Sequence, residues 1–238
     1  MTLRIEEPAP GVMLLTLDRP AQRNAIDLVL ADALAAALSE LDADPRWRAG
    51  IVTGAQPAFC AGLDLKAFSA PDAPRSRVTE VIVAFANRHK PMIAAVNGAA
   101  YTGGLEIALS CDFIIAAESA RFADTHAKIG ALSGSGMGSR LPRAVGARFA
   151  RQMMLTCAPI DAATALRVGL ANEVVAADAL LSRAIDLATM MAGHDPEIVG
   201  IAKQVVDRGT EATLAEAIVI EREALARRKA KGTMAWTR

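Results

Sequence analysis

The segment of residues 91–112, PMIAAVNGAAYTGGLEIALSCD, constrains the fold of this chain more than any other. Its apolar run from Met92 to Val96 is typical of a buried strand. A turn of small residues follows, and the pair Gly103–Gly104 leads into a predicted helix over 105–111. Glycines at such a turn let another molecule approach the backbone closely. The segment therefore predicts a buried strand that enters a helix through a glycine turn.

Glu106 lies three residues beyond Gly103, in the first turn of the predicted helix. The first N–H groups of a helix have no partner within the helix, so they can bind a developing negative charge, with the helix dipole assisting. Two interpretations stay open on these residues alone. Either Glu106 is an acid/base beside an anion site, or it is a first-turn carboxylate that matches the helix dipole.

Strands and helices alternate through the first half of the chain. Val12 to Leu17 is apolar on both faces, as expected of a buried strand. Further strands are predicted over 49–53 and 113–117, helices over 27–41 and 75–88, and a loop over 54–62. This alternation predicts an α/β fold with largely parallel strands.

The second half of the chain is predicted to be mostly helical. Asp161 can cap one helix, and Asp195–Pro196 places a capping residue before a proline that begins another. The last predicted helix covers 213–229. Its apolar face contains Leu214, Ile218 and Leu225. We therefore expect two parts, an α/β core of residues 1–190 and a helical region of residues 191–238.

Charge and composition exclude some classes of partner. The 238 residues include 26 basic and 26 acidic side chains, so the formal charge is zero, and only 4% are aromatic. This balance gives no reason to expect binding to nucleic acid or to an anionic membrane surface. The basic end of the last helix is expected to be a solvated, dipole-matched terminus. No apolar run is long enough to span a bilayer and no targeting pattern is visible, so we expect a soluble cytoplasmic protein.

The cysteines point to a reducing compartment. Cys60, Cys111 and Cys157 are odd in number, widely separated and without the spacing of metal ligands. We therefore expect free thiols, and no metal site.

A second glycine segment, residues 58–66 with the sequence AFCAGLDLK, has the same character as the first. It leaves a strand through small residues and a glycine, and a short helix is predicted to begin near Asp64. The Leu63 N–H can then face a ligand for the same reason as the Gly103 N–H. Two backbone donors from separate loops can converge on one carbonyl oxygen, which is how an oxyanion hole stabilises an enolate.

With these segments, the chain resembles the crotonase superfamily, the enoyl-CoA hydratase/isomerase group. The resemblance extends from about residue 3 to residue 175 without large insertions. The matching segments are DRPAQRNAI (18–26), AFCAGLDL (58–65), PMIAAVNGAAYTGGLEIALSCDFIIAA (91–117), RLPRAVGARFARQMMLT (140–156) and DAATALRVGLANEVV (161–175).

The resemblance implies a fold, an assembly and a substrate. The fold is an α/β spiral of ββα units followed by a C-terminal helical region that makes trimer contacts, so the partner is a further copy of the chain in a homotrimer or a dimer of trimers. The substrate is an acyl-CoA thioester, and because coenzyme A is part of the substrate, no separate cofactor is expected. The thioester oxygen is expected to bind the backbone N–H groups of Leu63 and Gly103.

The resemblance also implies a coenzyme A site along the second glycine segment. Its expected residues are Ala25, Ala61, Leu63, Asp64, Leu65, Lys66 and Gly103. Ala25 and Ala61 are expected near the adenine and pantetheine, and Lys66 is either near a coenzyme A phosphate or an ordinary surface lysine. For Asp64, a role at the start of a helix is expected before any role in the reaction.

Glu106 occupies the position of the first catalytic glutamate of the family's hydratases, but the second glutamate, twenty residues later, is replaced by His126. The pKa of an unperturbed histidine lies near 6.5, so His126 can serve as an acid or a base. Either His126 replaces the second carboxylate or it is a structural histidine. The following loop, 131–138, contains no carboxylate, and Asp124 is expected in a surface or capping role.

We therefore predict an enoyl-CoA hydratase with Glu106 and His126 as catalytic residues. Three alternatives use the same frame: an enoyl-CoA isomerase, a decarboxylase acting on a malonyl-type thioester, and a non-catalytic acyl-CoA binding protein.

Overall fold

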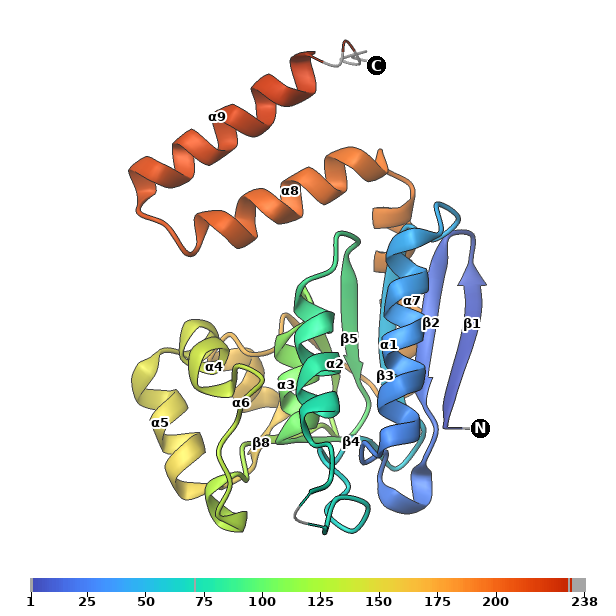
Figure 1. The fold of residues 1–238 in the computed structure, drawn as a ribbon, viewed down its shortest axis with the longest axis vertical. Coiled ribbons are helices and arrows are strands. Elements are labelled where there is room, and N and C mark those ends of the chain that lie inside the picture. The colour runs from blue at the N-terminus through green and yellow to red at the C-terminus, as the bar shows by residue number, and fades with distance from the viewer. Residues whose placement is uncertain (1, 71, 231, 233–238) are drawn as a thin grey trace. The chain divides into compact units, whose positions relative to one another are not determined.

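The computed structural model describes residues 2–70, 72–230 and 232, and the chain divides into two compact units, residues 1–193 and 194–238 (Figure 1). The first unit contains the strands of the described residues, which form two sheets. The larger sheet has the order β1-β2-β3-β5-β7-β10 and the smaller sheet has the order β4-β6-β8-β9. The described residues of the second unit form two helices.

The larger sheet is parallel except at one edge. Its strands are β1 (Leu3–Ala9), β2 (Val12–Leu17), β3 (Ala49–Gly54), β5 (Met92–Val96), β7 (Phe113–Ala117) and β10 (Glu173–Val175). Only the β1–β2 pair is antiparallel. In the smaller sheet, β4 (Ala58–Cys60), β6 (Ala99–Tyr101) and β8 (Arg121–Ala123) pair in parallel, and the short β9 (Ile160–Asp161) is antiparallel to β8.

Successive pairs of strands build a repeated ββα unit. In each unit the first strand joins the larger sheet, the second joins the smaller sheet, and a helix follows. The three units are β3–β4–α2 (Ser76–Ala86), β5–β6–α3 (Gly103–Leu109) and β7–β8–α4 (Met137–Val145). The arrangement confirms the predicted α/β spiral of ββα units.

The central strands of the larger sheet, β2, β3 and β5, are buried on both faces, which explains why they are continuous apolar runs. On β5, Met92, Ala94 and Val96 join the main hydrophobic cluster, whereas Ile93 and Ala95 join a second cluster. The main cluster includes buried side chains of α1 (Leu28–Ala43) and α2, and the second includes those of α7 (Leu180–Ala192). Each large apolar side chain buried in this way stabilises the fold by roughly 1.5–3 kcal/mol.

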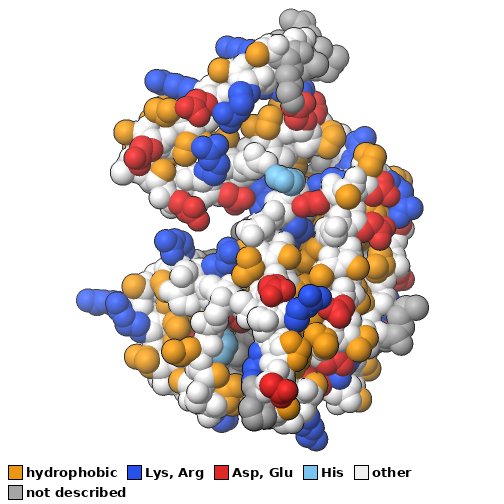
Figure 2. All heavy atoms as spheres, viewed as in Figure 1, with side chains coloured by type: hydrophobic (Ala, Val, Ile, Leu, Met, Phe, Trp, Pro, Cys, Tyr) orange, Lys and Arg blue, Asp and Glu red, His pale blue; other side chains and the backbone are white. Residues whose placement is uncertain are grey.

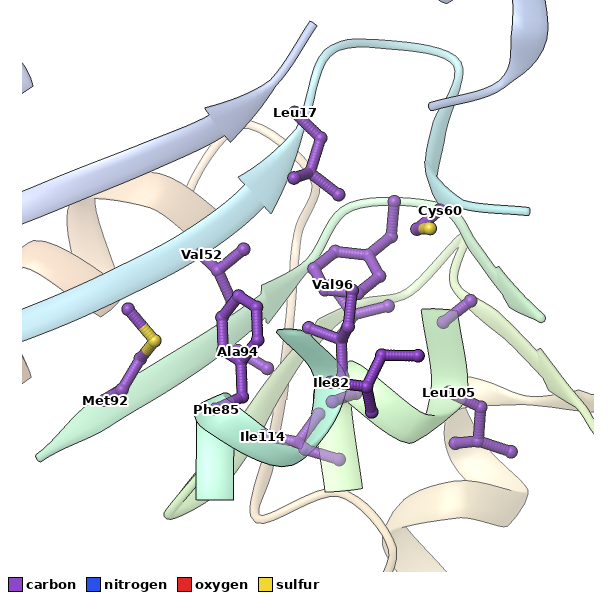
Figure 3. Close-up of a cluster of buried hydrophobic side chains, with 14 of the residues drawn as sticks. Leu17, Val52, Cys60, Ile82, Phe85, Met92, Ala94, Val96, Leu105 and Ile114 are labelled. Carbon is purple, nitrogen blue, oxygen red and sulfur yellow. The ribbon is translucent and has the colours of Figure 1, made fainter. Parts of the chain in front are cut away.

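The main cluster lies directly behind the segments that carry the predicted site. Figure 3 draws Ile82 and Phe85 of α2, Val96 of β5 and Leu105 of α3 among the side chains of this cluster. Phe85 and Leu105 are fully buried. The glycine turn before α3 is therefore held by a rigid, close-packed interior rather than by a mobile surface loop.

Most predicted elements are confirmed, and two differ. The expected loop at 54–62 contains the three-residue strand β4, which is too short to show a periodic pattern. The expected short helix near Asp64 is a single turn, in which Asp64 accepts hydrogen bonds from the N–H groups of Lys66 and Ala67, both at 3.2 Å. The other helices of the first unit, α5 (Ala147–Thr156) and α6 (Ala162–Arg167), follow α4, and Asp161 caps α6 as predicted.

The second unit contains α8 (Pro196–Gly209) and α9 (Leu214–Ala230). Asp195 caps α8 as predicted, and on α9 Glu223 and Arg227 form an ion pair one helical turn apart, at 3.7 Å. Arg228, however, is not a solvated terminal residue. Its side chain is only 11% exposed and forms ion pairs with Asp195 and Glu197.

The exposed surface mixes charges of both signs with scattered apolar side chains on the face drawn in Figure 2. Cys60 is buried, Cys111 and Cys157 are half-buried, and the structure contains no disulfide among these three residues. No helix in the described part of the chain is both long and apolar enough to cross a membrane.

Candidate active site

The two glycine segments predicted from the sequence meet in the structure. Gly62 follows β4 with a backbone φ of +94°, and a Cβ added there would lie only 3.1 Å from the Gly103 nitrogen. Conversely, a Cβ added at Gly103 would lie 3.3 Å from the Gly62 Cα. Only glycine satisfies the left-handed φ and the close approach together. Leu63 and Gly103 therefore lie side by side, although forty residues separate them.

The N–H groups of Leu63 and Gly103 donate no hydrogen bond to any described residue of the chain. Gly103 is the first residue of α3, so its N–H has no partner within the helix. Leu63 forms a parallel β-bridge with Ile26. In this bridge the Ile26 N–H donates to the Gly62 carbonyl and the Asp64 N–H donates to the Ile26 carbonyl, so the Leu63 N–H takes no part in it. Two adjacent, partly buried N–H groups can bind one carbonyl oxygen and stabilise negative charge on it.

Thr102, which precedes Gly103, has a strained backbone. Its φ of +52° and ψ of −112° are rare for a residue with a branched side chain. Its N–H donates to the Ala123 carbonyl at 2.9 Å, and its hydroxyl is hydrogen-bonded to that of Thr125. The conformation that directs the Gly103 N–H is thus tied to the segment that carries His126.

Glu106 lies on the inward face of α3, and only 3% of the residue is exposed. The helix reaches this position because Gly104 has no side chain, since a Cβ there would lie 2.1 Å from the Cys60 carbonyl oxygen. Burial raises the pKa of Glu106 above its usual value, and hydrogen bonding from Ser133 and the positive charge of His126 oppose that rise. A buried carboxylate with a raised pKa is suited to proton transfer near neutral pH.

Ser133, in the loop that precedes α4, holds the Glu106 carboxylate. Its hydroxyl donates to Oε1 of Glu106 and accepts hydrogen bonds from the N–H groups of Ser135 and Met137, both at 3.2 Å. Sequence reasoning missed this residue. The expectation for the loop concerned carboxylates, and a serine in a Ser/Gly-rich segment is the ordinary composition of a turn.

His126 and Asp124 form a close pair. Nδ1 of His126 lies 2.6 Å from Oδ1 of Asp124, which also accepts the His126 N–H at 3.1 Å. The surface position expected for Asp124 is wrong, because only 2% of the residue is exposed. The pKa of His126 is raised chiefly by its hydrogen bond to Asp124, although partial burial opposes the shift, and the negative charge of Glu106 adds to it.

The structure thus brings the two predicted catalytic residues into one electrostatic cluster with Asp124. Glu106 comes from α3, and His126 and Asp124 come from the segment between β8 and the short helix η2 (Ala127–Ile129). Within the described ranges, no group of three or more histidine, cysteine, aspartate or glutamate side chains is arranged to hold a metal ion.

The residues expected to contact coenzyme A also lie together, and one arginine organises them. Arg19 donates to the Ala25 carbonyl and pairs with both Asp27 and Asp64, at 3.0 Å each. Burial opposes ionisation of Asp64, but the N–H of Ala67 and Arg19 lower the net pKa of its carboxyl. Asp64 is therefore an ionised structural anchor of this loop.

The remaining residues of that set differ in exposure. Ala25 is buried and Ala61 is half-buried, and the Ala61 N–H bonds to the Arg23 carbonyl at 3.0 Å. Leu65 and Lys66 are exposed, so both side chains are accessible to a ligand that lies along the loop.

Comparison with known proteins places this arrangement in a family. A profile described as enoyl-CoA hydratase/isomerase matches residues 7–234. The chain is 42% identical over 214 residues to a probable enoyl-CoA hydratase of Rhizobium meliloti, covering 89% of this chain and 83% of the relative. It is 36% identical over 218 residues to a 2,3-dehydroadipyl-CoA hydratase of Escherichia coli, covering 89% and 84%.

Solved structures give the same result. An enoyl-CoA hydratase from Bacillus anthracis matches with a TM-score of 0.91 at 32% identity, covering 95% of this chain and 90% of that chain. The enzyme of this name from Mycobacterium tuberculosis H37Rv matches with a TM-score of 0.80 at 41% identity, covering 96% and 100%. The fold and the paired glycine segments are those of the crotonase superfamily. Within it, the chain belongs to the enoyl-CoA hydratase/isomerase family, which confirms the family predicted from the motifs.

Proposed function

We propose that the protein is an enoyl-CoA hydratase that adds water across the C2–C3 double bond of a 2-enoyl-CoA thioester. The observation that carries the proposal is the adjacency of two unpartnered N–H groups, of Leu63 and Gly103, beside the buried carboxylate of Glu106. The relatives named above as hydratases support the same reaction.

The first part of the mechanism is enolate stabilisation. The thioester oxygen accepts hydrogen bonds from the Leu63 and Gly103 N–H groups. When an oxygen nucleophile adds at C3, the π electrons move toward this oxygen, where the two N–H groups stabilise the negative charge as it develops. Each such donor is worth about 3 kcal/mol of barrier, a factor of 10²–10³ in rate.

The second part is proton transfer. Hydration requires one group that activates water and one that delivers a proton to C2. Glu106 and His126 are the titratable pair available, because both belong to the same electrostatic cluster and both have raised pKa values. The pair replaces the two glutamates that the family resemblance implies.

Coenzyme A is proposed to lie along the segment of residues 61–66, with Ala25 nearby. The exposed Lys66 is available to a coenzyme A phosphate, whereas Asp64 serves to hold the loop through Arg19. Coenzyme A enters and leaves as part of the substrate, so the proposed chemistry requires no separate cofactor.

We also propose that the chain works as a homotrimer or a dimer of trimers. The support comes from the second unit, whose helices expose Val206, Leu214 and Val219 with 63%, 78% and 50% of each residue accessible. Apolar side chains in such numbers on two helices are typical of an oligomer contact.

The product identifies the reaction. Incubation with crotonyl-CoA and longer 2-enoyl-CoAs should give products heavier by one water, measured by mass spectrometry. An isomer of unchanged mass from a 3-enoyl-CoA, without any hydrated product, would instead establish an isomerase. Loss of carbon dioxide from a malonyl-type thioester would establish a decarboxylase, and tight binding without turnover would establish a binding protein.

A further inference from the structure

The hydrogen bonds of Ser133 determine where its proton lies. A serine hydroxyl has one proton and two acceptor sites. The N–H groups of Ser135 and Met137 are both donors to Oγ, so the hydroxyl's own proton is left for Oε1 of Glu106. A hydrogen bond donated to a carboxylate favours its ionised form. Ser133 therefore holds one orientation of Glu106 and favours the carboxylate over the acid.

Asp124 determines the proton of His126 in the same way. Its Oδ1 accepts from both the backbone N–H and the ring Nδ1, so Nδ1 carries a proton in either charge state of the ring. Nε2 is then the nitrogen that gains or loses a proton. Asp124 is buried, so its attraction for a protonated ring is screened little by solvent.

The charges of the cluster favour one distribution of protons. The charged groups that face Glu106 are His126 and Asp124, and those that face His126 are Asp124 and Glu106 of α3. The other groups at Glu106 are neutral donors, the Ser133 hydroxyl and the Met137 N–H at α4, and that N–H is shared with Oγ of Ser133. Two buried carboxylates repel each other, and a protonated His126 offsets both. An ionised Glu106 beside a neutral His126 leaves that repulsion uncompensated.

We infer that Asp124 and Ser133 are positioning residues that place the proton on His126 and leave Glu106 ionised, which makes His126 the general acid and Glu106 the general base. This inference rests on the proposed hydration and specifies which residue acts as the acid and which as the base. Neither Asp124 nor Ser133 is proposed to contact the reacting atoms, since each acts through its partner.

The assignment gives a balanced reaction. Glu106 takes a proton from water as the water oxygen bonds to C3, and the C2–C3 π electrons form the enolate. Nε2 of His126 then gives its proton to C2, and the enolate returns its electrons as that C–H bond forms. The product gains one water, Glu106 is left protonated and His126 neutral. Transfer of one proton from Glu106 to His126 restores the starting state.

The pH dependence of kcat/KM tests the inference. On the wild type, activity rises as Glu106 ionises and falls as His126 loses its proton, with the falling limb above pH 6.5 because the pKa of His126 is raised. Ser133→Ala removes a donor to the carboxylate, so the rising limb should move to higher pH. Asp124→Asn removes the partner charge, so the falling limb should move to lower pH by roughly one unit or more.

Matched variants control this measurement. Ser133→Thr retains the hydroxyl and should restore the position of the rising limb. Ser139→Ala and Asp178→Asn, at exposed positions, should leave both limbs unchanged. A fall in kcat without displacement of either limb of the pH profile would overturn the inference, because it would show that both residues have only a structural role. Movement of the rising limb by Asp124→Asn, with the falling limb moved by Ser133→Ala, would reverse the acid and base.

A second readout separates this inference from the proposed function. The chain has three histidines, so the ring nitrogen resonances of ¹⁵N-histidine protein can be assigned by comparison with His126→Gln. The pKa of His126 should lie above 6.5 and should fall in both Asp124→Asn and Glu106→Gln. If it does so in a protein that hydrates no enoyl-CoA, the proton placement stands and the proposed function fails. An unshifted His126 overturns the inference whether or not hydration occurs.

Discussion

The buried position of Glu106 disfavours the ionised form of its carboxyl group. Its raised pKa results first from burial, and the hydrogen bond from Ser133 recovers only part of the lost hydration. Active-site groups of this kind reduce stability in return for reactivity. The same residue should therefore give opposite results in assays of activity and of stability.

Glu106→Gln should raise the stability of the folded protein at neutral and alkaline pH. The folded-state pKa of Glu106 lies above its ordinary value near 4.5, so the stability that the protonated acid contributes is full below pH 4.5 and is lost as pH rises through the folded pKa. Glutamine keeps an oxygen for Ser133 and avoids this loss. Thermal unfolding at pH 8 should show a gain of about 1 kcal/mol.

The gain should shrink as the pH is lowered toward 4.5. Glu118→Gln, which neutralises an exposed carboxylate in the turn after β7, should show little change at any pH. A Glu106→Gln variant that is less stable than the wild type at pH 8, or whose gain is independent of pH, would contradict the burial argument.

At the scale of elements, the site is the junction of two strand-exit turns. Gly62 follows β4 and Gly103 begins α3, and the two backbones are in contact. Because the predicted hole is made of backbone, side-chain truncation cannot remove it. Displacement of one turn relative to the other can disrupt the hole.

Gly62→Ala should therefore lower kcat by about 10²–10³-fold, the typical effect of losing one donor of an oxyanion hole. The added Cβ meets the Gly103 nitrogen at 3.1 Å, and the φ of +94° is strained for alanine. Gly169→Ala is the matched control, since Gly169 has a φ of +80° but its added Cβ meets no described atom closer than 3.5 Å. Both variants should unfold at lower temperature, and only Gly62→Ala should lose turnover. Equal turnover in the two variants would exclude the proposed role of the Gly62–Gly103 contact.

The elements that could be predicted from the sequence are those with strong local patterns. The strands Val12–Leu17 and Met92–Val96 were identifiable because burial on both faces leaves an unbroken apolar run. The three residues of β4 carry no such pattern, and their pairing with β6 depends on tertiary structure. Whether such a short strand forms depends on the neighbouring strands with which it pairs.

The candidate site was predictable for a different reason. Gly62, Gly103 and Glu106 occur in distinctive segments, so family resemblance could place them. Ser133 contacts Glu106 across 27 positions of sequence, and neither segment contains a sign of the other. The burial of Asp124 likewise depends on the packing around the start of η2. Contacts between distant loops required the fold.

At the scale of the whole molecule, the two units differ in how they use apolar side chains. The first unit buries them in two clusters, whereas α8 has no buried residue and α9 has only Ala224 among the described ones. Helical stability in water comes mostly from packing of an apolar face, so this unit has a reason to associate with further copies of the chain.

Ile218→Glu combined with Leu225→Glu should dissociate the proposed trimer. Both residues lie on α9 with 39% and 46% exposed, and a charge at an apolar contact must be buried without a partner. Sedimentation velocity should show a trimer or hexamer for the wild type and a monomer for the variant. Ser119→Glu, in an exposed turn of the first unit, adds a charge elsewhere and should not change the mass. A monomeric wild type would contradict the proposed assembly.

The Leu63–Gly103 pair and the Glu106–His126 pair are proposed to hydrate an enoyl thioester together. Turnover of crotonyl-CoA by Glu106→Gln, His126→Gln and the double variant, with binding of the ester measured separately, tests this proposal most directly. Each single variant should lose about 10²–10⁴-fold in kcat with the ester still bound, and the double variant should lose little more, because the residues act as a unit. Hydration at the wild-type rate by either single variant would show that the residue takes no part in the mechanism and would rule out the proposed Glu106–His126 pair.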